Sequence, residues 1–161
     1  MPAIVTQAPP QSAPPAPAPH DPVNRPVHYR GAGIEAIDVI EDWVADSGAH
    51  LGTALKYVLR AGRKEGVPRE QCLAKAAWYV ARARERIRRG DVVAAWARTN
   101  YPRIDRDRVA RGFNLDDDMR LAVLGISCAL SGPTFVDHWL GVAAEALGRA
   151  LVPAPTSASG V

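Results

Sequence analysis

The spacing of hydrophobic and polar residues along the chain predicts a protein built from α-helices. In several segments, apolar residues recur at intervals of three and four, which places them on one face of a helix. The expected helices cover 34–44, 51–62, 68–89, 114–130 and 134–151, and a further short one starts at Asp91. No stretch alternates for long enough to predict a strand. We therefore predict an all-α fold, a small helical bundle.

Each of the first three helices has an apolar stripe that we expect to be buried. These stripes are Ile34, Ile37, Ile40 and Val44; then Leu51, Ala54, Leu55, Val58 and Leu59; then Leu73, Ala76, Ala77, Val80 and Ile87. The remaining faces carry Glu35, Asp38 and Asp42; then Thr53, Lys56, Tyr57, Arg60 and Lys64; then Lys75, Trp78, Tyr79, Arg82 and Arg86. Carboxylates, cations and aromatic rings on neighbouring helices suit an anionic, base-bearing ligand such as a nucleotide.

Proline content and helix breaks divide the chain into four parts. Nine of the fourteen prolines lie between Pro2 and Pro26, so residues 1–20 are expected to form a disordered Pro/Ala-rich tail. A helical domain is expected over 21–90, a helical extension over 91–151 and a second disordered tail over 152–161. Within the extension, the charged stretch 100–112 is predicted to be a loop.

Charge is unevenly distributed along the chain. Residues 21–55 include two basic and six acidic residues, residues 56–89 eleven and three, and residues 90–161 seven and eight. A basic middle between acidic neighbours indicates a local anion-binding surface, or helices that pair with one another.

The sequence predicts neither a secreted nor a membrane protein. The longest apolar run, 121–136, is interrupted by Ser131-Gly132-Pro133 and is too short to span a bilayer. The first residues lack the pattern of a signal peptide, and Cys72 and Cys128 form no metal or redox motif. We expect a cytoplasmic protein with both cysteines reduced.

Phosphate binding, if present, must come from cationic side chains, because the chain has no glycine-rich phosphate loop. Lys56 and Arg60 lie one helical turn apart, so their charged ends can converge on a polyanion. Arg63 and Lys64 are explained equally well as cations at the negative end of a helix dipole. Lys56 sits too early in the helix for that explanation.

Two other groups leave functional and structural readings open. Glu35, Asp38 and Asp42 are suitable ligands for a divalent cation, or an ordinary solvated helix face that pairs with the basic helices. His28 and Tyr29 can stack on a base and contact a phosphate, or can pack as a tether between the tail and the bundle. His50 is read as a residue of a helix start.

Several motifs then resemble the SaV-like family of small tailed-phage proteins. They are VNRPVHY, GIEAIDVIE, LGTALKYVLRAGRK and LAKAAWYV, which occur in the family's order between Val23 and Val80. The chain departs from the usual pattern at Arg25 (usually His), Thr53 (usually Asn) and Leu59 (usually Trp). The lost amide at Thr53 bears most directly on base recognition.

Some members of that family are described as nucleotide kinases, so the resemblance implies a phage nucleotide-binding protein, with transfer of phosphate to deoxynucleotides as an activity. It implies Lys56, Arg60, Glu35 and Asp38 as catalytic residues, and His28, Tyr29, Tyr57, Lys64, Lys75 and Tyr79 as substrate-binding residues. ATP would be the phosphate donor. The alternatives are a non-catalytic protein that sequesters a nucleotide or a signal molecule, and a nucleic-acid-binding accessory module using the basic third helix. We also expect a homo-oligomer in the cytoplasm of the infected host.

Overall fold

The structure, a computed structural model, describes residues 26–44, 48–90, 104–132 and 135–152. These residues are 73% helical and include six α-helices, which confirms the predicted all-α helical bundle. The predicted tails, apart from Val152, and the short helix after Asp91 lie outside the described residues. No helix in the described ranges is long and apolar enough to cross a bilayer.

A small hairpin precedes the helices and was not predicted. After the 3-10 turn η1 (Val27–Tyr29), β1 (Arg30–Gly31) pairs antiparallel with β2 (Ile34–Glu35), with Arg30 opposite Glu35. Each strand has two residues, too few for any alternation to be visible in the sequence. The helices follow in the order α1 (Ala36–Trp43), α2 (Ala49–Arg60), α3 (Arg69–Arg88), α4 (Arg106–Gly112), α5 (Asp117–Leu130) and α6 (Val136–Leu151).

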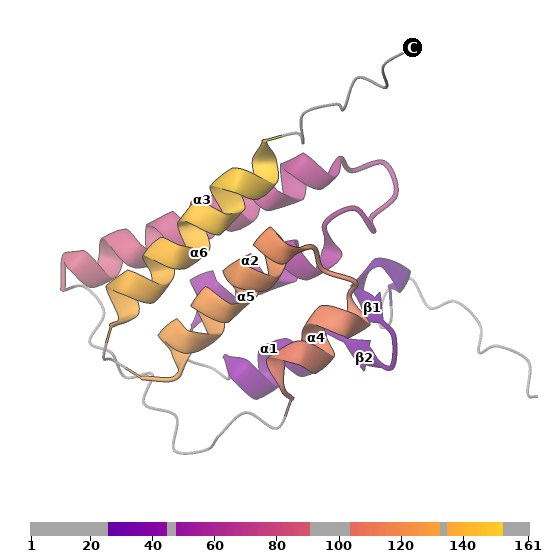
Figure 1. Cartoon of the computed structure of the whole chain (residues 1–161), viewed down its shortest axis with the longest axis horizontal. Helices are drawn as coiled ribbons and strands as arrows, with labels where there is room; N and C mark the ends of the chain where they lie inside the picture. Colours follow the sequence, from indigo (N-terminus) through magenta and orange to yellow (C-terminus); the bar gives the residue numbers. More distant parts are fainter. Residues whose placement is uncertain (1–25, 45–47, 91–103, 133–134, 153–161) are drawn as a thin grey trace, which may run out of the picture.

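Two helical hairpins make up most of the fold. Figure 1 shows α5 and α6 side by side in front of α2 and α3, with the shorter α1 and α4 alongside. Helix α3 packs on α6 and α2 packs on α5, so the two hairpins enclose one core. That core runs from Ile34 to Leu147 and joins the predicted domain at 21–90 to the predicted extension.

Glycine allows the second hairpin to close tightly. A Cβ atom on Gly125 of α5 would lie 2.7 Å from the carbonyl oxygen of Trp139 and 2.9 Å from the amide nitrogen of Ala143, both on α6. These distances are shorter than any normal carbon contact, so only glycine permits this approach. Gly125 therefore marks the closest approach described between α5 and α6.

The predicted core stripe is right for α2 and partly wrong for α1. Leu51, Ala54, Leu55, Val58 and Leu59 are all fully buried. In α1 the buried residues are Ala36, Val39 and Trp43, whereas Ile37 is 52% exposed. The indole of Trp43 is the reason, because it is almost fully buried and its Nε1 donates a hydrogen bond to the carbonyl oxygen of Ile104 (2.8 Å). Burying this large ring turns Ile37 towards the surface.

The expected loop over 100–112 is also wrong where the structure describes it. Residues 106–112 form α4. Asp105 caps its start, because the Asp105 carboxylate accepts a hydrogen bond from the amide of Arg108 (2.8 Å). Aspartate at this position satisfies an amide that has no partner within the helix. The charged residues of α4 are on its exposed side, and Val109 is fully buried beneath them.

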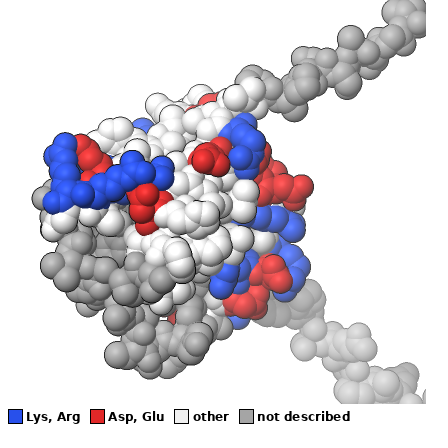
Figure 2. Space-filling model, turned by 60° about the vertical axis from the view of Figure 1, so that its left-hand side comes forward, with Lys and Arg blue, Asp and Glu red and all other residues white. Residues whose placement is uncertain are grey.

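An arginine–aspartate cluster links α3 to α6. Asp137 in the first turn of α6 accepts hydrogen bonds from the Nε atoms of Arg84 (2.8 Å) and Arg88 (2.7 Å). These two guanidinium groups hold the pKa of the Asp137 carboxyl well below its usual value. Figure 2 shows the same tendency on one face of the molecule, where basic and acidic side chains lie next to each other.

Candidate functional site

The ring of Tyr57 on α2 is surrounded by three cationic side chains. The Cζ atom of Arg60 lies 4.5 Å from the ring centroid, and the Nζ atoms of Lys56 and Lys75 lie 5.4 Å and 5.6 Å from it. Cations at these distances are attracted to the negative face of an aromatic ring. Lys56 and Arg60 come from α2 and Lys75 from α3, so the packing of these two helices assembles the group.

A second tyrosine, on α3, completes this group. The ring of Tyr79 stacks on Tyr57 with a centroid distance of 5.9 Å and an interplanar angle of 17°. We call Lys56, Tyr57, Arg60, Lys75 and Tyr79 the tyrosine–cation cluster. All five are among the residues implied by the family resemblance, and the structure brings them together.

Arg60 joins this cluster to the segment before α1. Its Nη1 donates a hydrogen bond to the hydroxyl of Tyr29 (2.9 Å), and the side chain of Arg60 is buried, contrary to its predicted place opposite the core stripe. Its Nε atom has no hydrogen-bond partner among the described residues. Burial lowers the pKa of Arg60, but hydrogen bonds with the Tyr29 hydroxyl and the Cys72 thiol raise it, and the net shift is upward. The guanidinium is therefore charged at every accessible pH.

His28 lies next to the same group. Its ring centroid is 4.3 Å from that of Tyr29. Burial, followed by the charges of Lys64 and Arg60, lowers the pKa of His28. Lys64 is not on α2 as predicted, because the helix ends at Arg60 and Lys64 belongs to the turn that follows. The explanation of Arg63 and Lys64 as cations in the last helical turn is therefore wrong.

Several arginines of the described ranges have an acidic partner, whereas the cations of the tyrosine–cation cluster have none there. Arg69, Arg84 and Arg149, for example, form ion pairs with Asp116, Asp137 and Asp118. Within the described ranges, neither Lys56, Arg60 nor Lys75 forms an ion pair with a carboxylate. Three positive charges in one place, with no carboxylate partner in the part of the chain that the structure describes, favour an anionic ligand.

The predicted carboxylates have structural partners. Glu35 and Asp38 form a capping box at the start of α1, in which the Asp38 carboxylate accepts a hydrogen bond from the Glu35 amide (3.0 Å). Asp42 accepts a hydrogen bond from the amide of Ile104 (2.9 Å). The described residues contain no group of three or more His, Cys, Asp or Glu side chains placed to hold a metal ion. The structure thus assigns the acidic face of α1 to capping and packing.

A small pocket lies between Lys56 and Glu35. Its volume is about 120 Å³, and Tyr29, Glu35, Ile37, Ile40 and Lys56 are among its lining residues. Ile40 and Lys56 also line a second hollow of about 370 Å³ that extends along α1 and α2 to Thr53. Sequence analysis missed Ile37 and Ile40 here because it placed both in the core. A larger hollow of about 520 Å³ between α4 and α5 contains none of the predicted site residues.

Comparison with known proteins gives one partial match. A family model described as a protein of unknown function (DUF3310) matches residues 23–81, which run from the segment before η1 into α3. All ten predicted site residues fall within this stretch. No curated protein and no solved structure matches the chain.

Proposed function

We propose that this protein binds a nucleotide at the tyrosine–cation cluster. The observation that carries the proposal is the gathering of Lys56, Arg60 and Lys75 around Tyr57 without a carboxylate partner in the described part of the chain. Arginine can donate two parallel hydrogen bonds to a phosphate, and lysine adds a mobile charge. The phosphates would lie on this cluster.

The pocket beside Lys56 supports a place for the remainder of the nucleotide. Its wall combines the apolar side chains of Ile37 and Ile40 with the polar groups of Tyr29 and Glu35. Apolar walls with a few polar groups are typical of small-molecule sites. A sugar or the edge of a base fits this chemistry, with the wider hollow towards Thr53 as an extension.

The finer proposal follows the resemblance to SaV-like phage proteins. The chain would transfer the terminal phosphoryl group of a nucleoside triphosphate, such as ATP, to a phosphate oxygen of a deoxynucleoside monophosphate, which yields two diphosphates. Lys56 and Arg60 would offset charge in the transition state, and Glu35 would orient the acceptor from its position in the pocket.

A non-catalytic binder is the second candidate function. The capping box favours it, because Glu35 and Asp38 already hold the start of α1 and have less freedom to act on a substrate. In that case the protein would bind a nucleotide without changing it.

Lysine modification provides a direct test of the site. The chain has three lysines, Lys56, Lys64 and Lys75, and all three are predicted site residues. We expect saturating deoxynucleoside monophosphate to slow reductive methylation of Lys56 and Lys75 at least threefold, measured by peptide mass spectrometry. Methylation of the chain's amino terminus in the same sample is the internal control. Equal methylation rates of Lys56 and Lys75 with and without each of the four deoxynucleoside monophosphates would contradict the proposal.

Mutation and product analysis then separate binding from transfer. Lys56→Ala and Lys75→Ala should weaken nucleotide binding about tenfold each, whereas Arg111→Ala, an exposed cation of α4, should leave it unchanged. Incubation with ATP and each monophosphate, followed by chromatography, should yield diphosphates if the protein is a kinase. Binding without product would support the second candidate.

A further inference from the structure

The outer face of α3 continues the basic and aromatic character of the cluster towards the end of the helix. Lys75, Trp78, Tyr79, Arg82 and Arg86 follow one another at intervals of one to four residues, and His50 of α2 lies beside them. We call these six residues the α3 strip. Only Lys75 and Tyr79 also belong to the tyrosine–cation cluster.

The aromatic rings of the α3 strip contact one another; Trp78 is open to solvent, whereas Tyr79 and His50 are half-buried. The rings of Trp78 and Tyr79 meet edge to face at a centroid distance of 4.9 Å, and His50 approaches Tyr79 at 6.1 Å. Trp78 is 60% exposed, which is unusual for a residue with so large an apolar surface. An exposed indole fixed by a neighbouring ring is a ready platform for stacking.

Positive charge extends along the same face. Lys75 and Arg86 form no ion pair with carboxylates of the described residues, whereas Arg82 pairs with Glu85 (2.8 Å). Burial, followed by the charges of Arg86 and Arg82, lowers the pKa of His50. The imidazole is therefore neutral near pH 7 and adds a further flat ring beside Tyr79.

The α3 strip is too long for one nucleotide. Lys75 and Arg86 are eleven residues apart on one helix, which corresponds to about 16 Å at 1.5 Å per residue. A stacked strand rises about 3.4 Å per nucleotide, so the strip matches roughly four or five nucleotides. A mononucleotide on the tyrosine–cation cluster would leave Trp78 and Arg86 without a contact.

We propose that the α3 strip binds single-stranded nucleic acid, with bases stacked on Trp78 and phosphates against Lys75 and Arg86. Interleaved aromatic and cationic side chains are the usual means of holding single strands without sequence preference. A duplex fits less well, because its bases are already stacked and do not present their faces to Trp78. The strip shares Lys75 and Tyr79 with the tyrosine–cation cluster, but the proposal rests on Trp78 and Arg86, which lie outside the cluster, and it does not require a mononucleotide to bind there.

Fluorescence anisotropy with labelled oligothymidylates of one, five and fifteen nucleotides tests this proposal. We expect affinity to rise with length up to about five nucleotides and to fall steeply with added salt. Trp78→Ala should weaken binding of the five-nucleotide strand about tenfold, and Trp78→Phe should restore most of it. Arg86→Gln should lower the slope of log affinity against log salt by about 0.7.

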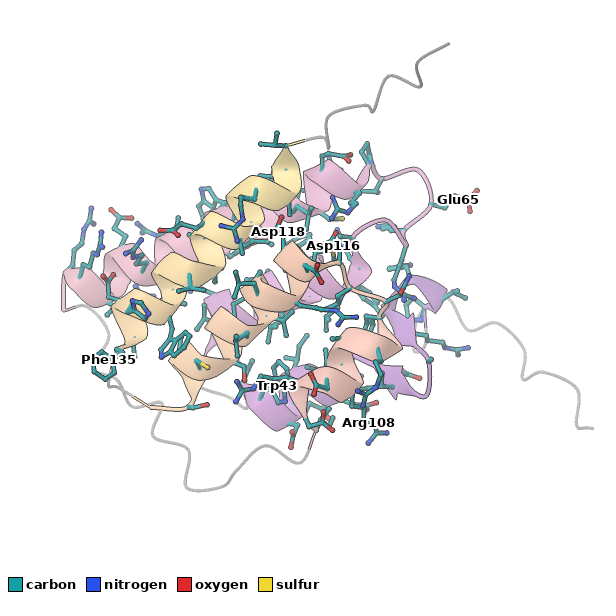
Figure 3. The ribbon with its side chains drawn as sticks, viewed as in Figure 1. Trp43, Glu65, Arg108, Asp116, Asp118 and Phe135 are labelled. Atoms are coloured by element: carbon teal, nitrogen blue, oxygen red, sulfur yellow. The ribbon has the colours of Figure 1, made fainter. Side chains whose placement is uncertain are left out.

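The matched control is Phe135→Ala. Phe135 is 71% exposed at the start of α6 and projects away from the helices (Figure 3), so it offers a similar aromatic surface outside the strip. Strands that bind equally well to the Trp78→Ala and Phe135→Ala variants would overturn the proposal, as would tighter binding of a duplex of the same length. We expect monophosphate binding to persist in Trp78→Ala, because Trp78 lies outside the tyrosine–cation cluster.

Discussion

Arg60 is the residue at which the candidate site and the hydrophobic core meet. Its side chain is 8% exposed, yet the charge is balanced by ring faces and a hydroxyl instead of a carboxylate. Burying a charge without an acidic partner is costly for folding. Such a cost is commonly tolerated at sites where a ligand supplies the missing charge.

His28 should make stability depend on pH. Its lowered pKa means that, below about pH 6.5, the unfolded chain takes up a proton that the folded protein resists. Stability should therefore be full above pH 6.5 and fall as the pH drops towards the lowered pKa. Melting temperatures measured from pH 7.5 to 5 should decline less in His28→Gln than in the parent protein.

The control for this experiment is His138→Gln, at an exposed position of α6. Its melting temperatures should follow those of the parent protein at each pH. If His28→Gln gives the same curve as His138→Gln, then burial and the charges of Lys64 and Arg60 do not lower the pKa of His28 in the way the structure implies.

Within the second hairpin, two glycines should respond oppositely to the same substitution. Gly125→Ala forces α5 away from α6 and should lower the free energy of unfolding by about 2 kcal/mol. Gly148 lies in α6, and a Cβ atom there would meet nothing within 4 Å. Gly148→Ala should therefore raise stability by up to about 1 kcal/mol, because alanine favours the helix. Urea denaturation monitored by circular dichroism measures both.

Unchanged stability in Gly125→Ala would contradict the close approach of α5 and α6, and a loss of stability in Gly148→Ala would contradict the open surface at that position. A double variant should show the sum of the two effects, since the contacts of Gly125 and the open surface at Gly148 share no partner.

At the scale of elements, periodicity predicted the helices better than their orientation. The stripe of α2 was right because its apolar residues lie on one side only. Helix α1 has isoleucines on one side and Ala36, Val39 and Trp43 on another, so the pattern alone did not decide which side is buried. Helix α4 was missed because most of its residues are charged, so that Val109 alone did not reveal an apolar stripe. Asp105 before it is, however, a residue type typical of a helix start.

The candidate site shows the same division between what sequence can and cannot predict. Regular spacing sufficed to place Lys56 and Tyr57 on one side of α2. The meeting of Tyr57 with Lys75 and Tyr79 depends on how α2 and α3 pack, which spacing within one helix does not determine. The burial of Arg60 depends on Tyr29, thirty-one residues earlier in the chain.

At the scale of the whole molecule, residues after position 90 complete the core beneath the site. Leu140 and Leu147 of α6 are fully buried in the cluster that also contains Leu73 and Val80 of α3. A fragment of residues 21–90 would expose the apolar side of α3 to water. The division into a domain at 21–90 and an extension remains a prediction.

We expect the fragment 21–90 to unfold without a cooperative transition, in contrast to the fragment 21–152. Thermal melts of both, followed by circular dichroism at 222 nm, provide the comparison. A sharp transition in the shorter fragment would show that the stretch matched by the family model folds by itself.

The contact between the hairpin and α4 offers a way to follow ligand binding by NMR. The Ala32 amide donates to the carbonyl oxygen of Gly112 (2.7 Å), and a Cβ atom on Gly31 would lie 2.6 Å from the same oxygen. Tyr29, three residues before Ala32, touches Arg60. Occupancy of the cluster should therefore shift the Ala32 resonance, a backbone reporter that needs no label on the ligand.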